Sequence, residues 1–236
     1  MAPGTPSATK LADGLALLFV AVVFMVHVTT GFLEIQSFAY GKSDTALYEQ
    51  GLWLASQFRM PVSNAYPGVV MNIFLGQHVM LPGFLYGLAF RLNPGLFAMV
   101  LMEGLSYSAA VLLLFIGFRS LWRSSWPALL LVYMYWASFI PIPAHFYFEN
   151  LAAPFTALGV CWTLRIQYRR AALAWLAVPL FKEYFALTSA VMGLVIFWKS
   201  RRVDGLALPI TAIAWFALAW LVIMPLAQSS SALASL

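Results

Sequence analysis

Long apolar segments separated by short basic connections dominate this sequence and constrain what it can fold into. Residues 15–28, 95–118 and 206–226 are clear examples, and runs of this composition are typical of helices that cross a lipid bilayer. Charged residues make up only 9% of the chain and hydrophobic residues 63%, which is too little charge to cover a soluble domain. The sequence therefore predicts an all-α, polytopic membrane protein.

The apolar segments predict about seven transmembrane helices. Residues 126–144 and 151–164 add two spans, and residues 171–199 carry Lys182 and Glu183 near their middle. That last segment permits either one long helix or a hairpin of two short helices. Basic residues gather at the cytoplasmic ends of spans, and only the hairpin brings most of them to one face. The nine of 13 basic residues that it brings together are Lys10, Arg119, Arg123, Arg165, Arg169, Arg170, Lys199, Arg201 and Arg202.

We therefore predict the hairpin, with a cytoplasmic N-terminus and with the hairpin tip inside the outer half of the bilayer. This arrangement corresponds to a multi-pass protein of the cell inner membrane. Residues 34–94 form the one long connection, an outer loop in which the 13 apolar residues 80–92 suit an interfacial or re-entrant helix. We interpret residues 1–228 as a single transmembrane module and residues 229–236 as a low-complexity tail or a truncated end.

Most acidic residues fall on the face opposite to the basic ones. The outer set comprises Glu34, Asp44, Glu49, Glu149 and Glu183, with His78 and His145 beside them. Asp13 and Asp204 lie on the cytoplasmic face, and Glu103 lies within a span. We therefore expect any chemistry to take place at the outer face.

Each candidate residue also has a structural interpretation. Asp44 precedes a helical run and suits a helix N-cap, and Glu49 lies about 140° further round that helix, so the two cannot share a face. Glu103 is costly inside a span unless it is paired or protonated, so it is a partner for Lys182, a neutral group bonded to Tyr107, or a functional residue.

Lys182 and Glu183 are neighbours in sequence and point in different directions, so each needs a different partner. His78 opens the short helix of the outer loop and is either an interface residue or a ligand. Glu149 begins the next span and is the stronger functional candidate of its segment.

Several classes of function are excluded by missing motifs. The sequence contains neither G-x-G-x-x-G nor G-x-x-x-x-G-K-S/T, and it lacks H-E-x-x-H and G-x-S-x-G. Its single cysteine, Cys161, permits neither an internal disulfide nor a cysteine metal site. The net charge of +5 follows from membrane topology, so we predict the bilayer and not a nucleic acid as a partner.

Four short blocks occur in the order typical of one family. They are Asp44 to Trp53 (DTALYEQGLW), Leu75 to His78 (LGQH), Phe146 to Pro154 (FYFENLAAP) and Phe181 to Leu187 (FKEYFAL). The chain thereby resembles a bacterial family of predicted membrane proteins, domain of unknown function 2079. That family is grouped with the polyprenyl-phosphate-dependent glycosyltransferases of superfamily C (GT-C). Tyr147 stands where the family pattern has a histidine.

The resemblance implies glycosyl transfer at the outer face from a polyprenyl-phosphate sugar to an acceptor. Asp44 is then the candidate general base, with Glu49 and Glu149 as further catalytic carboxylates, and Lys182 contacts the phosphate. The remaining substrate-binding candidates are Glu183, His78, Tyr147 and Glu103. A divalent cation, Mg²⁺ or Mn²⁺, between Asp44 and Glu149 or His78 is a further expectation.

A non-catalytic role is the alternative to this enzyme. The same buried charges could line the pathway of a transporter or form structural pairs in a subunit of a membrane complex. Transporters commonly carry broken helices in both halves of an internal repeat, and this sequence has one broken pair and no convincing repeat.

Overall fold

The protein is mostly helical in the computed structural model, which describes residues 6–37, 43–66, 69–137, 148–201 and 203–228. Within these residues, three helices are long and apolar enough to cross a membrane: Lys10–Gln36, Leu96–Trp122 and Ala207–Gln228. At 1.5 Å per residue, 22 residues span roughly 33 Å, slightly more than the roughly 30 Å hydrocarbon core. The chain is thus a membrane protein with several spanning helices.

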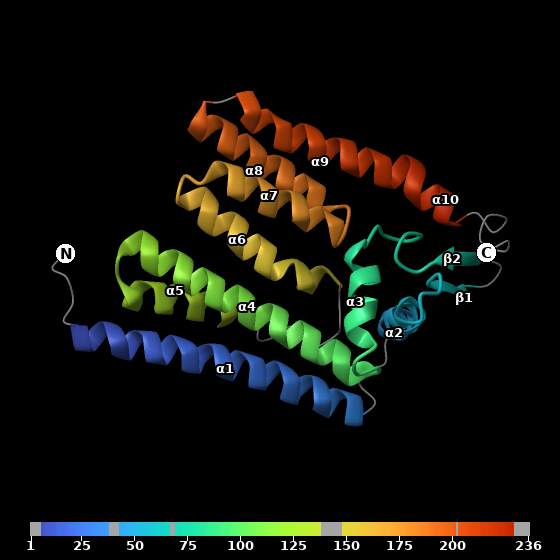
Figure 1. Ribbon diagram of the computed structural model, residues 1–236, viewed down its shortest axis with the longest axis horizontal. Helices are drawn as coiled ribbons and strands as arrows, with labels where there is room; N and C mark the ends of the chain where they lie inside the picture. The colour runs from blue at the N-terminus through green and yellow to red at the C-terminus, as the bar shows by residue number, and fades with distance from the viewer. Residues whose placement is uncertain (1–5, 38–42, 67–68, 138–147, 202, 229–236) are drawn as a thin grey trace.

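The three long helices correspond to α1 (Pro6–Gln36), α4 (Leu96–Trp122) and the C-terminal pair α9 (Ala207–Leu218) and α10 (Met224–Gln228). A π-helical turn, Ala219–Ile223, joins α9 to α10 without breaking the helix. The helices run alternately in opposite directions across the bundle (Figure 1). The first predicted span is therefore longer than residues 15–28, because its polar flanks continue the helix.

Shorter helices fill the bundle between the long ones. They are α5 (Ser125–Ala137), α6 (Ala153–Leu164), α7 (Tyr168–Ala177) and α8 (Phe185–Ser200). Helix α6 packs against both α4 and α7, and α8 packs against α9, so α6 links the two halves of the bundle (Figure 1). The expected total of seven spans stays a prediction.

Residues 171–199 form the predicted hairpin and not one long helix. Helix α7 ends at Ala177, a 3₁₀ turn covers Val178–Leu180, and α8 begins at Phe185. Pro179 cannot continue an α-helix, and it lies in this turn. The Ser189 hydroxyl donates a hydrogen bond of 2.6 Å to the Trp175 carbonyl and ties the two arms together.

The long connection folds over one end of the bundle, the loop end (Figure 1). It comprises α2 (Ser43–Ser56), β1 (Val62–Tyr66), β2 (Val69–Asn72) and α3 (Pro82–Phe90). The short helix predicted over residues 80–92 is thus confirmed as α3.

The purely α-helical prediction is wrong in one detail, because β1 and β2 form an antiparallel pair in which Val62 faces Asn72 and Ser63 faces Met71. Turn residues in this part of the sequence indicated only a loop. Yet Val62 and Tyr66 in the first segment and Val69 and Val70 in the second are residue types that favour strands.

An aromatic cluster attaches the loop end to the bundle. Phe148 is fully buried. The centre of its ring lies 5.2 Å from that of Tyr48 and 5.3 Å from that of Phe74, and both of these residues belong to the long connection. The ring centre of Tyr86 in α3 lies 6.4 Å from the ring centre of Phe148 and 6.4 Å from that of Phe181. These contacts hold η1 (Phe148–Ala152) and the tip of the α7–α8 hairpin against the long connection.

The opposite end of the bundle, the arginine end, carries basic side chains. Arg119 pairs with Asp13 at 2.8 Å, and the Arg165 guanidinium donates to the carbonyls of Ile116 and Gly117. Arg169 and Arg170 start α7 at this same end (Figure 1). The tip with Lys182 therefore lies at the other end of the bundle from these arginines, as predicted.

Candidate functional site

The tip of the α7–α8 hairpin binds the long connection through Glu183. One carboxylate oxygen lies 2.8 Å from His78 Nδ1, and the other accepts a hydrogen bond of 2.9 Å from the Val79 N–H. The Glu183 side chain is only 2% exposed, whereas the His78 side chain is 35% exposed. The Leu81 N–H donates to the Leu180 carbonyl at 2.9 Å beside this contact. Glu183 thus fixes the tip against the residues that precede α3.

Lys182 points to a different partner from its neighbour Glu183. Its Nζ donates a hydrogen bond of 2.7 Å to Glu149 Oε1 and lies 5.0 Å from the centre of the Tyr184 ring. The Tyr184 hydroxyl is 3.4 Å from the same Glu149 oxygen. The side chains of Lys182 and Glu149 are 10% and 17% exposed, so this ion pair is largely shielded from solvent. The prediction of separate partners for Lys182 and Glu183 is confirmed.

Glu149 keeps one oxygen uncommitted. Its Oε2 is buried and has no hydrogen-bond donor among the residues that the structure describes. Glu149 follows the buried Phe148 in η1, so the aromatic cluster holds the backbone that presents this carboxylate. A buried carboxylate oxygen without a donor is unusual, and such groups are found at strained or catalytic positions and where a water or an ion binds.

Glu103 lies nearby and is bonded to Asn150, the residue after Glu149. The Asn150 amide donates to Glu103 Oε1, and the Ser106 hydroxyl donates to the Asn150 carbonyl at 3.0 Å. The proposed pairing of Glu103 with Lys182 is wrong, because Lys182 reaches Glu149 instead. An amide partner lets the buried Glu103 be satisfied without a second buried charge.

Glu34 is a residue that sequence reasoning did not include in the site. It lies in the last turns of α1, and its charge and that of Glu149 both act on the Glu103 carboxyl group. Glu34 Oε2 is also buried without a donor among the described residues. The charges of Glu34 and Glu149 therefore both act on Glu103, and Glu149 is also paired with Lys182. The sequence signal was the position of Glu34 at the outer end of the first span.

The tip carries two ionisable groups with pKa values that move in opposite directions. Burial alone would raise the pKa of Glu183, but the bonds from His78 and from the Val79 N–H bring it below its ordinary value. Burial would lower the pKa of Lys182, yet its bond to Glu149 raises that pKa instead. Both groups are thus held in their charged forms near neutral pH.

Other predicted residues lie apart from this cluster or outside the described part. Glu49 of α2 borders a separate hollow with Trp53 and Phe90, and burial raises its pKa. Asp44 begins α2, but its side chain lies outside the described residues, and Tyr147 lies outside them entirely. The described residues hold no group of three His, Cys, Asp or Glu side chains arranged for a metal ion.

The fold and this cluster define a polytopic membrane protein with a shielded Lys-Glu pair at one end of its bundle. The family of predicted membrane proteins DUF2079 matches residues 34–235, most of the chain. The chain therefore belongs to this family, as its sequence blocks predicted. Neither the curated proteins nor the solved structures include a match to this chain.

Proposed function

We propose that this protein is a membrane glycosyltransferase of the GT-C type, which moves a sugar from a polyprenyl-phosphate donor to an acceptor. The observation that carries the proposal is the shielded contact between Lys182 and Glu149, next to a Glu149 oxygen that has no donor among the described residues. A cation and a carboxylate at one partly shielded site can bind a phosphate and take up a proton. Glycosyl transfer from a lipid phosphate requires both functions.

The chemistry divides between these two groups. The bond between the anomeric carbon and the phosphate oxygen breaks, and polyprenyl phosphate leaves with the bonding electrons. The acceptor hydroxyl forms the new bond to the anomeric carbon and loses its proton to a carboxylate. In this proposal Lys182 turns from Glu149 to the phosphate and stabilises its negative charge, which frees Glu149 to receive the proton.

Two carboxylates are candidates for the general base. Family resemblance assigns the role to Asp44, whereas the contacts at the tip favour Glu149. We propose that Glu183 is a positioning residue, because its carboxylate is already bonded to His78 and Val79. The resemblance implies that Glu49 is a further catalytic carboxylate and that Tyr147 and Glu103 bind substrate, and we keep these roles in the proposal.

A divalent cation is not required by this scheme. His78 is bonded to Glu183, and Glu149 to Lys182, so the described donors do not form a set for Mg²⁺ or Mn²⁺. The proposal further places the tip at the outer face of the inner membrane, with the N-terminus in the cytoplasm, since basic residues favour the cytoplasmic side.

Binding of the leaving group gives the first test. We would measure the dissociation constant of a polyprenyl phosphate for the purified protein in detergent by native mass spectrometry. Lys182→Met is expected to weaken binding by roughly 10- to 150-fold, because a charge-assisted hydrogen bond contributes about 1.5–3 kcal/mol. Lys199→Met removes one exposed charge at the arginine end and is expected to leave binding unchanged. Equal binding by Lys182→Met and the wild type would contradict the role of Lys182.

Turnover of labelled lipid-linked sugars identifies the base. If Asp44 is the base, Asp44→Asn abolishes transfer and Glu149→Gln only weakens it. If Glu149 is the base, the order is reversed. Unchanged turnover in both variants would contradict both assignments. Absence of transfer by the wild type over a panel of donors, together with absence of polyprenyl-phosphate binding, would favour the transporter or subunit alternative.

A further inference from the structure

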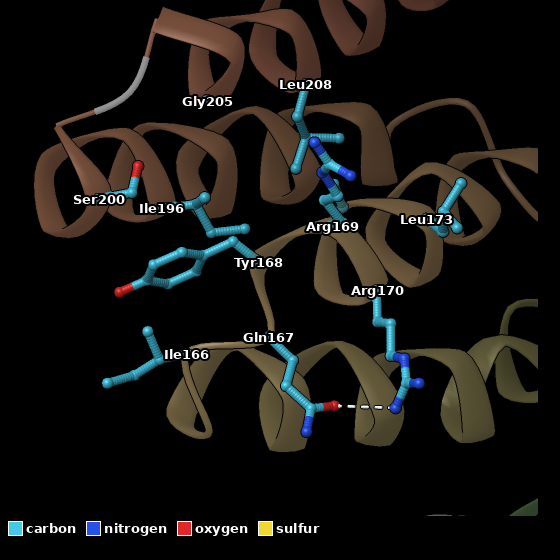
Figure 2. Close-up of a pocket in the computed structure, with 11 residues that line it drawn as sticks. Ile166, Gln167, Tyr168, Arg169, Arg170, Leu173, Ile196, Ser200, Gly205 and Leu208 are labelled. Atoms are coloured by element: carbon cyan, nitrogen blue, oxygen red, sulfur yellow. Dashed lines mark hydrogen bonds between the residues drawn. The ribbon is translucent and has the colours of Figure 1, made fainter.

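A cavity lies at the arginine end, at the opposite end of the bundle from the Lys182–Glu149 pair of the proposed site. It has a volume of about 880 Å³ and is bordered by the turn before α7, by the first part of α7, by the end of α8 and by the start of α9. Volumes between 300 and 1,000 Å³ are typical of ligand pockets. Figure 2 shows that the lining side chains come from all of these segments.

Two arginines give the cavity its charge. The Arg170 guanidinium donates a hydrogen bond of 3.2 Å to Gln167 Oε1, whereas the Arg169 side chain turns the other way, towards Leu208 (Figure 2). Both arginines are exposed, and among the side chains that the structure describes no acidic one borders the cavity. The first turn of α7 also places the positive end of that helix here. The cavity is therefore suited to an anion, with Arg169 as the less committed of the two charges.

Apolar side chains form a large part of the remaining wall, and further apolar side chains are exposed on the outside of the bundle. Ile196 and Leu208 line the cavity, and Leu173, which also borders it, is 69% exposed. Exposed apolar side chains continue along the neighbouring helices at Trp198 of α8 and Ile210 of α9. Apolar side chains of this kind on a membrane protein contact acyl chains, and a tryptophan near a helix end is typical of the membrane interface. The cavity thus opens onto a surface that lipid tails can occupy.

We propose that this cavity binds the phosphate headgroup of an anionic phospholipid, with an acyl chain along Leu173 and the outer face of α9. Arg169 is the main phosphate contact, and Arg170 supports it from the Gln167 side. Basic pockets between membrane helices are suited to such headgroups. A soluble phosphate compound would use the charge and leave the exposed apolar wall uncovered, so the two features together favour a lipid. This site is separate from the Lys182 site and does not depend on the proposed glycosyl transfer.

Competition between two lipids tests the proposal. The purified full chain in detergent would be mixed with equal amounts of phosphatidylglycerol and phosphatidylcholine, and the retained lipids counted by native mass spectrometry. The wild type is expected to retain phosphatidylglycerol preferentially. Arg169→Ala should lower this preference roughly fivefold, since an interfacial basic residue contributes about 1 kcal/mol to anionic-lipid binding. Arg170→Ala should lower it less, and Arg169→Lys should largely preserve it.

Matched controls make the result specific. Arg59→Ala removes one exposed arginine from the loop end and should leave the preference unchanged. Leu173→Gln keeps every charge but should weaken retention of long-chain phosphatidylglycerol. Circular dichroism would confirm that each variant keeps its helix content. No preference in the wild type, or an equal loss in Arg59→Ala and Arg169→Ala, would overturn the proposal. Displacement of the lipid by excess inorganic phosphate, with no effect of Leu173→Gln, would instead assign the site to a soluble phosphate.

Discussion

The two ends of the helix bundle carry their charges in opposite ways. At the loop end, Lys182 and Glu149 form a pair whose side chains are 10% and 17% exposed. At the arginine end, the side chains of Arg119 and Asp13 are 44% and 29% exposed. A shielded pair must be held in place by packing, whereas an exposed pair is solvated and contributes little. The comparison indicates that the loop end is held by shielded polar contacts, whereas the charged pair at the arginine end is exposed.

The largest expected effect concerns the packing that supports the loop end. Phe148→Ala should lower the free energy of unfolding by about 3–5 kcal/mol, because it leaves a cavity where a fully buried ring was. Phe118 at the other end is only partly buried and stacks on Trp122 at 5.2 Å. Phe118→Ala is expected to cost about 1 kcal/mol, in line with a loss of one aromatic pair. Denaturant unfolding in detergent, followed by circular dichroism, measures the free energy of unfolding of both variants. Equal losses of stability would contradict the difference between the two ends.

The second effect concerns the shielded ion pair. Lys182→Met should lower the free energy of unfolding by about 2–3 kcal/mol, slightly less than for a fully buried pair, because Glu149 keeps its charge without a partner. Adding Glu149→Gln removes that isolated charge, so the double variant should be more stable than Lys182→Met alone. A double-mutant cycle on unfolding in detergent provides the measurement. Simple addition of the two single effects would show that the two side chains do not interact.

The third effect is a decrease in stability at low pH that Glu183 causes. The folded pKa of Glu183 lies below the ordinary 4.5, so this group contributes stability above that pH and loses it as the pH falls through the lowered value. Thermal unfolding of the wild type between pH 7 and pH 3 should therefore show a loss of stability as the pH falls below the ordinary 4.5, and this loss should be smaller in Glu183→Gln. Above pH 5 the substitution should cost about 1–3 kcal/mol through the lost charged acceptor.

Glu49 provides a control for this experiment, because its pKa shifts in the opposite direction to that of Glu183. Burial raises its pKa, so its protonation as the pH falls adds stability, and Glu49→Gln should remove that gain. If Glu183→Gln and Glu49→Gln changed the pH profile in the same direction, the assignment of Glu183 as a charged tip contact would be wrong.

The smallest effect is expected at the arginine end. Arg119→Ala breaks an exposed pair, and Asp13 keeps a hydrogen bond of 2.9 Å from the Ser125 hydroxyl. The cost should stay below about 1 kcal/mol and shrink further in high salt. Unfolding at low and high ionic strength checks this, and a loss as large as that of Lys182→Met would show that exposure does not separate the two pairs.

Much of the fold could be predicted because hydropathy and the placement of charge act over long segments. The choice between one helix and a hairpin at residues 171–199 followed from the distribution of lysines and arginines, and Pro179 supplies the local reason. The β1–β2 pair was missed, because two short strands with turn residues between them carry a weak signal beside long apolar helices.

The site was predictable by residue type but not by pairing. Sequence order required Lys182 and Glu183 to have different partners, and the structure supplies Glu149 and His78. The choice of partner for each residue depended on how Phe148 packs. Phe148 contacts Tyr48 and Phe74, which lie about 70 to 100 residues before it in the chain. Periodicity and motifs contain no information on such contacts.

The central claim is that the Lys182 tip and the arginines lie on opposite membrane faces. Cysteine labelling in spheroplasts tests it most directly, in a Cys161→Ser background with a single new cysteine near each end. A membrane-impermeant maleimide should label Gln77→Cys, next to His78, in intact spheroplasts, and should label Lys199→Cys only after lysis. Labelling of both variants before lysis, or of Gln77→Cys only after it, would contradict the account.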